Sequence, residues 1–314
     1  MTDCQSEFST VTVLNQLAST LGLAEPLSSP NSVWFDRTDG GRLHALDWGG
    51  TGPNVLLLHG GALSAYTWTL CCLLLSPKYH CVAIDLRGHG DSDWADDYSI
   101  PAHVSNVHQV LAQLNWSYAH LVGMSLGGVI AAHAALTEGE TTTASLTLVD
   151  VAPVVSFGDT QRLREFMASP VVHDGTEALK TAARRLGAAQ SDEELLYRYN
   201  SLIHRDAAGV WQWKHDRRKP FNYQHVLDHL SMLEAAAHRM HYPCLVARGG
   251  RSRILGEQAA DRFARACPQG QYCTVLQAGH SVQEDNPKQL AAELRTFWTS
   301  VADADKTLTS TDNS

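Results

Sequence analysis

The sequence predicts an α/β protein with a mostly parallel, doubly wound sheet, flanked by helices and interrupted by a helical insertion. Short runs rich in Val, Leu and Ile alternate with segments of helical periodicity along most of the chain. The apolar runs lack polar alternation, which is typical of strands buried on both faces of a parallel sheet. The alternation stops between Pro153 and Pro243, where about 90 residues carry helical patterns instead.

Six apolar runs are the expected strands of this sheet. They are NVLLLHG (54–60), HCVAIDL (80–86), AHLVGMS (119–125), SLTLVDV (145–151), YPCLVAR (242–248) and YCTVLQAG (272–279). Between the second and third runs, the apolar residues of HVSNVHQVLAQLN (103–115) recur with the 3.6-residue period of a helix. A closing helix is expected over 286–301, with Asn286 as N-cap and Pro287 at its first position.

These segments divide the chain into an extension, a core and a cap. Residues 1–30 form an N-terminal extension with one helix, VTVLNQLASTLG; whether it packs on the core stays open. The core is 31–152 and 243–302, and a polar, flexible tail follows at 303–314. The helical cap is 153–242, with no convincing strand pattern. An insertion that leaves one strand end and returns to the next covers the ligand-binding edge of the sheet.

Within the cap, three segments carry helical patterns: TEALKTAARRLGAA (176–189), SDEELLYRYNSLI (191–203) and VLDHLSMLEAAAHRM (226–240).

Composition excludes several classes of protein. The 314 residues are 44% hydrophobic, which provides for a sizeable core. The net charge of −9 and pI near 5.9 argue against a nucleic-acid partner. No apolar stretch approaches the roughly 20 residues that span a bilayer, so no membrane partner is expected. Seven cysteines without paired metal spacing, and a start that lacks a leader pattern, suit reduced thiols in a cytoplasmic protein.

The strongest motif is GMSLGG, which places Gly123, Ser125 and Gly127 between an apolar run and a helical pattern. A serine on a tight strand-to-helix turn needs small residues two before and two after it, because those positions approach neighbouring elements. The turn exposes the hydroxyl and brings the start of the helix beside it. The N–H of Leu126 can therefore bind a developing oxyanion, and Ser125 is the expected nucleophile.

A second motif, LLLHGGALS, follows the first strong strand. With this motif the sequence resembles the α/β-hydrolase superfamily from about Val33 to Val301. The resemblance implies that the N–H of Gly61 is the second oxyanion donor and that His59 is structural. The segment DLRGHGDSDW also resembles the family's loop after the fourth strand, in which Asp85 and His89 stabilise the loop.

The third motif, LQAGHSVQEDNP, places His280 after the last expected strand. A serine hydroxyl is a poor nucleophile until a base takes its proton, and imidazole does this near neutral pH. His280 is therefore the expected base.

The acid of the triad is displaced in this sequence. Most members of the family carry it after the seventh strand, where the segment RGGRSRIL has Arg253. A minority, including ABHD11-like esterases, place it after the sixth strand, and SLTLVDVAP offers Asp150 there. Neighbouring strands lie about 4.8 Å apart, so the histidine loop can be reached from either strand. Asp150 is the expected acid; another carboxylate and an inactive chain stay as alternatives.

The expected function is that of a serine hydrolase without a cofactor or metal, which cleaves a small-molecule carboxylic ester or lactone. Met124, Trp211, Trp213 and Arg253 are candidates for the substrate pocket, with cap packing as the alternative for the two tryptophans. A C–C bond hydrolase, a lyase, a perhydrolase and a non-catalytic ligand-binding homologue remain as other functions. The oligomeric state, monomer or homodimer, is left open.

Overall fold

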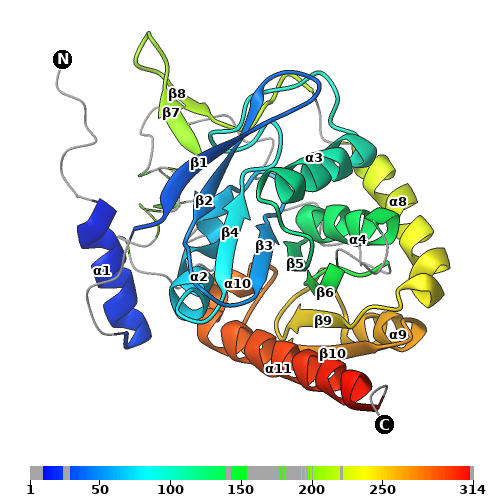
Figure 1. The fold of residues 1–314 in the computed structure, drawn as a ribbon. Helices are drawn as coiled ribbons and strands as arrows, with labels where there is room; N and C mark the ends of the chain where they lie inside the picture. Colours follow the sequence, from blue (N-terminus) through cyan, green and yellow to red (C-terminus); the bar gives the residue numbers. More distant parts are fainter. Residues whose placement is uncertain are drawn as a thin grey trace.

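A computed structural model describes residues 10–23, 29–138, 143–153, 201–219 and 222–311, with seven single positions between 177 and 199. The strands of the main sheet, in spatial order, are β1 (Asn31–Asp36), β2 (Arg42–Asp47), β4 (His80–Ile84), β3 (Asn54–Leu58), β5 (Ala119–Met124), β6 (Thr143–Val149), β9 (Cys244–Gly249) and β10 (Gly270–Val275) (Figure 1). All neighbours from β4 to β10 are parallel. The predicted α/β class and mostly parallel sheet are confirmed.

Two strands at one edge were not predicted. β1 pairs with β2, and β2 with β4, in antiparallel register. Most positions of β1 are exposed or half-buried, so its sequence, NSVWFD, lacks the continuous apolar run by which the other strands are recognised.

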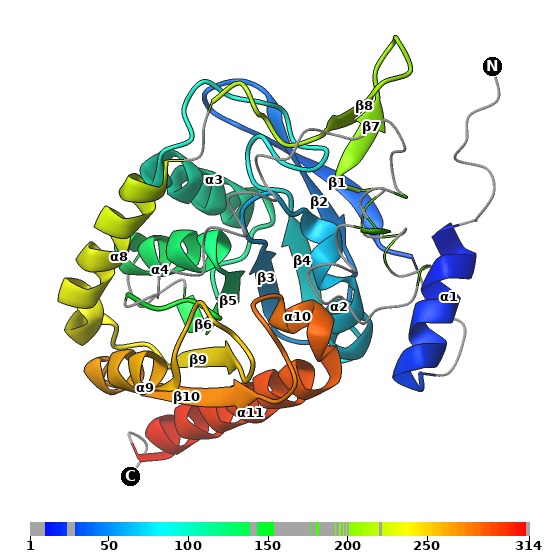
Figure 2. The same ribbon diagram turned by 180° about the vertical axis from the view of Figure 1, so that it is seen from behind.

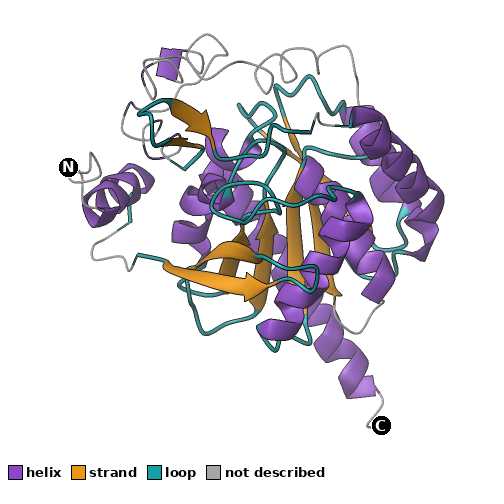
Figure 3. Cartoon of the chain, turned by 90° about the horizontal axis from the view of Figure 1, so that it is seen from above, coloured by secondary structure: helices purple, strands orange, loops and turns teal. Residues whose placement is uncertain are grey.

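Helices cover both faces of the sheet (Figures 1 and 2). One core contains residues of α3 (Ile100–Gln113), α4 (Leu126–Glu138), α8 (Tyr223–Ala236) and α9 (Glu257–Ala266). The opposite core contains residues of α1 (Thr10–Leu21), α2 (Thr69–Leu75) and α11 (Pro287–Thr311). Seen from above, the strands lie between these two layers (Figure 3).

The central strand β3 shows why its sequence is apolar throughout. Leu56 and Leu58 belong to the first core, whereas Val55 and Leu57 belong to the second. Successive side chains of a strand point to opposite faces, so a strand covered on both sides needs an apolar residue at every position.

The N-terminal helix α1 packs on the core. Leu14 and Leu17 are buried in the same cluster as residues of α2 and α11. The ammonium of Lys288 in α11 also donates to the carbonyl of Thr20 at 3.2 Å. The extension therefore contributes to the hydrophobic core of the domain.

The C-terminal tail differs from the prediction. A flexible tail was expected from residue 303, but α11 continues to Thr311. The segment from Ala302 to Thr311 contains no glycine or proline that would end the helix, and its Ala, Lys and Leu residues favour helix. At the other end, Asn286 accepts a hydrogen bond from the N–H of Gln289 at 3.2 Å, in agreement with the predicted N-cap.

The segment expected to form the cap contains a hairpin that was not predicted. β7 (Ile203–Arg205) and β8 (Trp211–Trp213) pair in antiparallel register, closed by a turn in which the N–H of Gly209 donates to Asp206. The expectation of a cap without strands is wrong here; strands of three residues are too short to show a clear period. The third predicted cap helix is confirmed as α8, while most of 176–200 lies outside the described residues.

In the part of the chain that the structure describes, no helix combines the length and apolar character needed to cross a bilayer.

Candidate active site

Ser125 occupies a sharp turn between β5 and α4. Its φ is 51°, a left-handed conformation that is rare for a residue with a side chain. The N–H of Ser125 donates to the carbonyl of Val149 on β6 at 3.1 Å. This bond holds the turn to the neighbouring strand.

The glycines on either side of Ser125 are required by space. A Cβ at Gly123 would lie 2.3 Å from the carbonyl oxygen of Gly127. A Cβ at Gly127 would lie 2.4 Å from the carbonyl oxygen of Leu58, at the end of β3. Both contacts are with backbone atoms, so any larger side chain would force the turn or the strand to move.

The loop after β3 lies against the serine. A Cβ at Gly60 would be 3.3 Å from the Cβ of Ser125 and 2.5 Å from the sulfur of Met124. Neither the N–H of Gly61 nor that of Leu126, the first residue of α4, has a hydrogen-bond partner among the described residues. Both predicted oxyanion donors thus belong to segments that border Ser125 and are available for a ligand.

His59 holds the loop in place. Its buried imidazole accepts a hydrogen bond from the N–H of Leu86 at 2.9 Å, and Nδ1 lies 2.7 Å from the carbonyl oxygen of Gly60. Burial, followed by the nearby His89, lowers the pKa of His59 to about 3. A neutral imidazole can accept and donate at once, as these two contacts require.

Asp85 organises the loop after β4. Its carboxylate accepts from the backbone N–H groups of Ala65 and Asp91, at 2.6 and 2.9 Å, and lies 2.7 Å from Nδ1 of His44. Asp85 therefore connects this loop with β2 and with the segment after Gly61. His44, Asp85 and Asp91 are also near enough to one another to hold a metal ion. The hydrogen bonds that join Asp85 to the imidazole of His44 and to the N–H of Asp91 explain why these three residues lie close together.

Asp150 stands directly after β6 and is completely buried. Its φ is 51°, and its N–H donates to the carbonyl of Ala247 on β9 at 2.8 Å. Like Ser125, it occupies a left-handed turn at the carboxyl edge of the sheet. The turn aims its carboxylate across β9 rather than along β6, because one carboxylate oxygen meets Gly249, the last residue of β9, and the other meets Ser252 in the loop that follows.

His280 meets Asp150 from the loop after β10. Nδ1 of His280 lies 2.7 Å from Oδ2 of Asp150, with the imidazole 19% exposed. A Cβ at Gly249 would lie 2.0 Å from the carbonyl oxygen of Gly279, so the histidine loop runs directly over the end of β9. Among the described residues His280 makes no hydrogen bond to the hydroxyl of Ser125; such bonds are often long before a substrate binds.

The other acids near the seventh-strand loop are occupied elsewhere. Asp261 pairs with Arg265 at 2.8 Å on the surface of α9, and Glu257 accepts from the hydroxyl of Tyr272 at 3.4 Å. Arg253 itself is exposed and has no hydrogen bond or ion pair with another described residue. Asp150 is therefore the carboxylate that the structure places against His280.

A comparison with known families agrees with this geometry. The family model described as the alpha/beta hydrolase fold matches residues 53–287, which include Ser125, Asp150 and His280. The chain belongs to the α/β-hydrolase family. Its named relatives, an esterase and a lipase, show that it is a hydrolase.

Individual relatives of this α/β-hydrolase share most of its length. The esterase Rv0045c of Mycobacterium tuberculosis is 31% identical over 279 residues, covering 83% of this chain and 87% of the relative. The mouse sn-1-specific diacylglycerol lipase ABHD11 is 26% identical over 266 residues, covering 80% and 83%. A crystal structure of the M. tuberculosis esterase superposes with a TM-score of 0.73 at 27% identity, covering 93% of this chain and 98% of that one.

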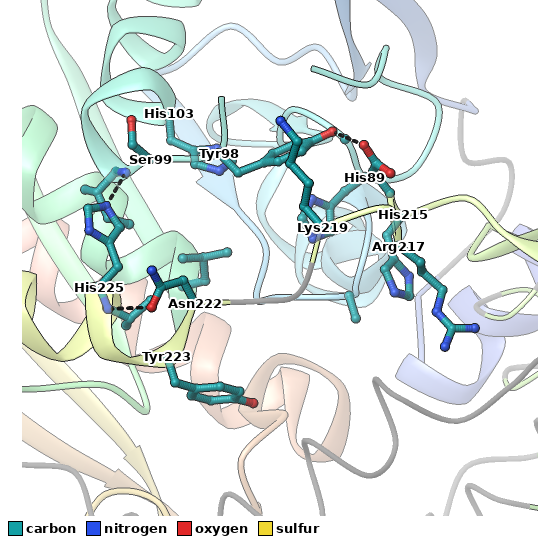
Figure 4. Close-up of a pocket in the computed structure, with 16 residues that line it drawn as sticks. His89, Tyr98, Ser99, His103, His215, Arg217, Lys219, Asn222, Tyr223 and His225 are labelled. Atoms are coloured by element: carbon teal, nitrogen blue, oxygen red, sulfur yellow. Dashed lines mark hydrogen bonds between the residues drawn. The ribbon is translucent and has the colours of Figure 1, made fainter. Parts of the chain in front are cut away.

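A cavity of about 650 Å³ opens beside the oxyanion segments of the hydrolase (Figure 4). It is lined by Ala62 and Leu126, by residues 88–89, 98–100 and 103, and by residues between 215 and 226, which belong to the segment expected to form the cap. That segment thus supplies one wall of a space whose other wall borders the expected oxyanion hole.

Four histidines line this cavity: His89, His103, His215 and His225 (Figure 4). Burial lowers the pKa of His89 and holds that of His103 well below its usual value. Burial, with the nearby His89, lowers the pKa of His215 to about 3. The last, His225, is oriented by an acceptor bond from the N–H of Ile100 at 3.2 Å. At neutral pH three of the four imidazoles are therefore uncharged hydrogen-bonding groups.

These histidines were not predicted to line a pocket; only His89 had an expected role, that of stabilising its loop. The ring of His89 lies 5.2 Å from that of His59 in the loop after β3 and 6.1 Å from that of His215. One signal was available: the loop with His89 follows β4, whose carboxyl end lies on the same edge of the sheet as Ser125.

The four predicted pocket residues are not among those that line this cavity. Met124 is buried in the core that faces α2 and α11. Trp213 is buried in a small cluster of cap residues, and Trp211 packs under the guanidinium of Arg205 at 4.7 Å. The tryptophans thus have the packing role that was their alternative interpretation, and contact of these residues with substrate stays a prediction.

Proposed function

We propose that the protein is a serine hydrolase that cleaves a carboxylic ester or lactone through an acyl-enzyme on Ser125. The observation that carries this proposal is the 2.7 Å contact between buried Asp150, which follows β6, and His280, which follows β10. Only β9 lies between these strands, at the edge of the sheet where Ser125 turns. The named relatives, an esterase and a lipase, support an ester as substrate.

The reaction follows from the roles of these groups. Nε2 of His280 takes the proton of the Ser125 hydroxyl as its oxygen attacks the substrate carbonyl. Asp150, bonded to Nδ1, fixes the tautomer that leaves Nε2 able to accept. The alkoxide leaving group takes the proton from His280, and the acyl group remains on Ser125. Water, deprotonated by His280, then attacks the acyl carbon; the bond to the Ser125 oxygen breaks, that oxygen takes the proton back from His280, and the acid is released.

The oxyanion of each tetrahedral intermediate is bound by the N–H groups of Gly61 and Leu126. Leu126 directly follows Ser125, and Gly61 follows Gly60, which borders Ser125; both N–H groups lack a partner among the described residues. The N–H of Leu126 also belongs to the start of α4, where the helix dipole favours negative charge.

The cap, residues 153–242 in this proposal, closes the acyl or alcohol side of the site. Its described part provides His215, Tyr223 and His225 to the cavity wall. The mostly uncharged imidazoles provide hydrogen-bonding groups for a substrate, and the charged side chains of Asp216, Arg217 and Lys219 line the same cavity. The six described cysteines are free thiols, which agrees with a cytoplasmic location.

Labelling with a fluorophosphonate probe tests the nucleophile. We expect one adduct on Ser125 in the wild type, found by mass spectrometry of the digested protein, and hydrolysis of short p-nitrophenyl esters. Ser125→Ala should lose both the adduct and the turnover while keeping its melting temperature. A wild type that neither reacts with the probe nor cleaves such esters would support the non-catalytic alternative.

A further inference from the structure

The carboxylate of Asp150 is held from the end of β9 and the loop that follows it. Oδ1 accepts the N–H of Gly249, the last residue of β9, at 2.9 Å. Oδ2 accepts the hydroxyl of Ser252 at 2.5 Å and also lies 2.7 Å from Nδ1 of His280. Both donors belong to the segment RGGRSRIL (248–255), in which most members of the family carry their acid, and here the segment supplies two donors to an acid that follows another strand.

The direction of the Ser252 hydroxyl is determined by its other contacts. The N–H groups of Ile254 and Leu255 both point at Oγ, at 3.1 and 3.4 Å. Because these groups are donors, they occupy the lone-pair side of Oγ. The hydroxyl proton is therefore directed at Asp150.

The loop itself is anchored to its surroundings. The N–H of Ser252 donates to the carbonyl of Gly249 at 3.0 Å. The N–H groups of Gly250 and Arg251 donate to the carbonyls of Val275 and Ala278, each at 2.8 Å. Ser252 is thus fixed to the same segment, after β10, that carries His280.

We propose that Ser252 is a positioning residue that sets the orientation of the Asp150 carboxylate toward His280. The terminal torsion of an aspartate is broad, so the orientation of its carboxylate depends on partners. Gly249 restrains Oδ1 alone. Ser252 restrains Oδ2, the oxygen that receives the histidine, and so keeps the triad aligned. This inference rests on the proposed function, because it assigns a task within the Ser125, His280 and Asp150 triad.

The first test compares variants of Ser252 in steady-state ester hydrolysis. Ser252→Ala and Ser252→Cys should lower kcat roughly tenfold with little change in KM, because a hydrogen bond to a charged group is lost while substrate contacts remain. Ser252→Thr keeps the hydroxyl and should retain at least about half of the wild-type kcat. Ser300→Ala, the same change on the exposed face of α11, is the matched control and should be unaltered.

The second test is a double-mutant cycle with Asp150→Asn. If Ser252 acts through Asp150, Ser252→Ala should change kcat less than about twofold in the Asp150→Asn background, although it costs roughly tenfold in the wild type. A residue that only stabilises the loop would cost the same factor in both backgrounds. The near-isosteric Ser252→Cys variant serves in both backgrounds if the alanine variant does not fold.

The outcomes separate this inference from the proposed function. Wild-type kcat in Ser252→Cys, or equal losses in both backgrounds, would overturn the role of Ser252 while leaving the triad intact. Full activity in Asp150→Asn or Ser125→Ala would instead overturn the proposed function.

Discussion

At the scale of single residues, two left-handed turns determine the site. Ser125 and Asp150 each have a φ of 51° at the carboxyl end of adjacent strands. Such conformations cost about 1–3 kcal/mol and persist where the surroundings fix them. Here the fixing bonds are backbone bonds to the next strand, from Ser125 to Val149 and from Asp150 to Ala247.

Gly127, two residues after Ser125, provides a prediction at the scale of single residues. Gly127→Ala would place a Cβ 2.4 and 2.5 Å from the carbonyl oxygens of Leu58 and His59. The end of β3 and the oxyanion loop must then move, so we expect kcat to fall about 100-fold and stability to fall by about 1–3 kcal/mol. Kinetics and thermal unfolding measure the two effects.

Gly256→Ala is the control for this change. An added Cβ at Gly256 meets no atom within 4 Å, and the backbone there has no positive φ, so wild-type kcat is expected. Stability should fall by no more than the roughly 0.5–1 kcal/mol that alanine costs at the N-cap of α9. A Gly127→Ala protein as active as this control would show that the turn is less crowded than the structure indicates.

Motifs along the chain predicted the individual members of the proposed triad but not their supporting contacts. Ser125 and His280 stand in local patterns of glycine and strand ends, and Asp150 follows an apolar run. Ser252 had no such signal. Its role depends on a contact over 102 positions in the sequence, which only the fold brings together.

At the scale of elements, hydrophobic patterns predicted the strands that are continuously apolar. The six predicted strands and α8 were found. The pattern failed for β1, which is mostly exposed, and for β7 and β8, which have three residues each. It also missed β2, in which the buried polar residue His44 interrupts the apolar residues. It also placed the end of α11 too early, because a polar helix surface looks like a tail in the sequence.

Packing of α1 provides an element-scale prediction. Leu14 is completely buried in the cluster that includes α2 and α11, so Leu14→Ala should lower the free energy of unfolding by about 2–5 kcal/mol. Urea denaturation measures this change. The neighbour Gln16 is exposed, and Gln16→Ala should be neutral. Equal stability of the two variants would mean that α1 does not pack on the core.

At the scale of the whole molecule, the sheet separates two cores and brings its chemistry to one edge. The loops after β3, β5, β6 and β10 carry Gly61, Ser125, Asp150 and His280 in turn. An open α/β sheet binds ligands at this edge, so the order of strands explains why residues far apart in the sequence meet. The sequence predicted that the site lies at this edge. It did not predict the cavity wall formed by residues between 215 and 226, because that wall depends on how this segment packs and its sequence pattern does not determine the packing.

Buried histidines provide a prediction for the whole fold. Burial lowers the pKa of His120 to about 4, below the 6.5 of an unfolded histidine. Above pH 6.5 both states are neutral. As pH falls from 6.5 toward 4, the unfolded chain binds a proton that the folded chain does not, so stability falls by up to about 1.4 kcal/mol per pH unit for this group. Burial acts in the same direction on His59.

Denaturant titrations between pH 7.5 and 4.5 check this dependence. His120→Gln should be less sensitive to acid than the wild type over that interval, because one titrating group is removed. An identical pH slope in the two proteins would contradict a neutral, buried His120.

The central claim is that the acid of the triad stands after β6, at Asp150. The most direct measurement is kcat of Asp150→Asn beside the wild type, with the fold of the variant verified by thermal unfolding. Asparagine keeps the shape but loses the charge that orients and stabilises the imidazolium, so kcat should fall by roughly 10⁴. A folded Asp150→Asn protein with near-normal turnover would contradict the claim.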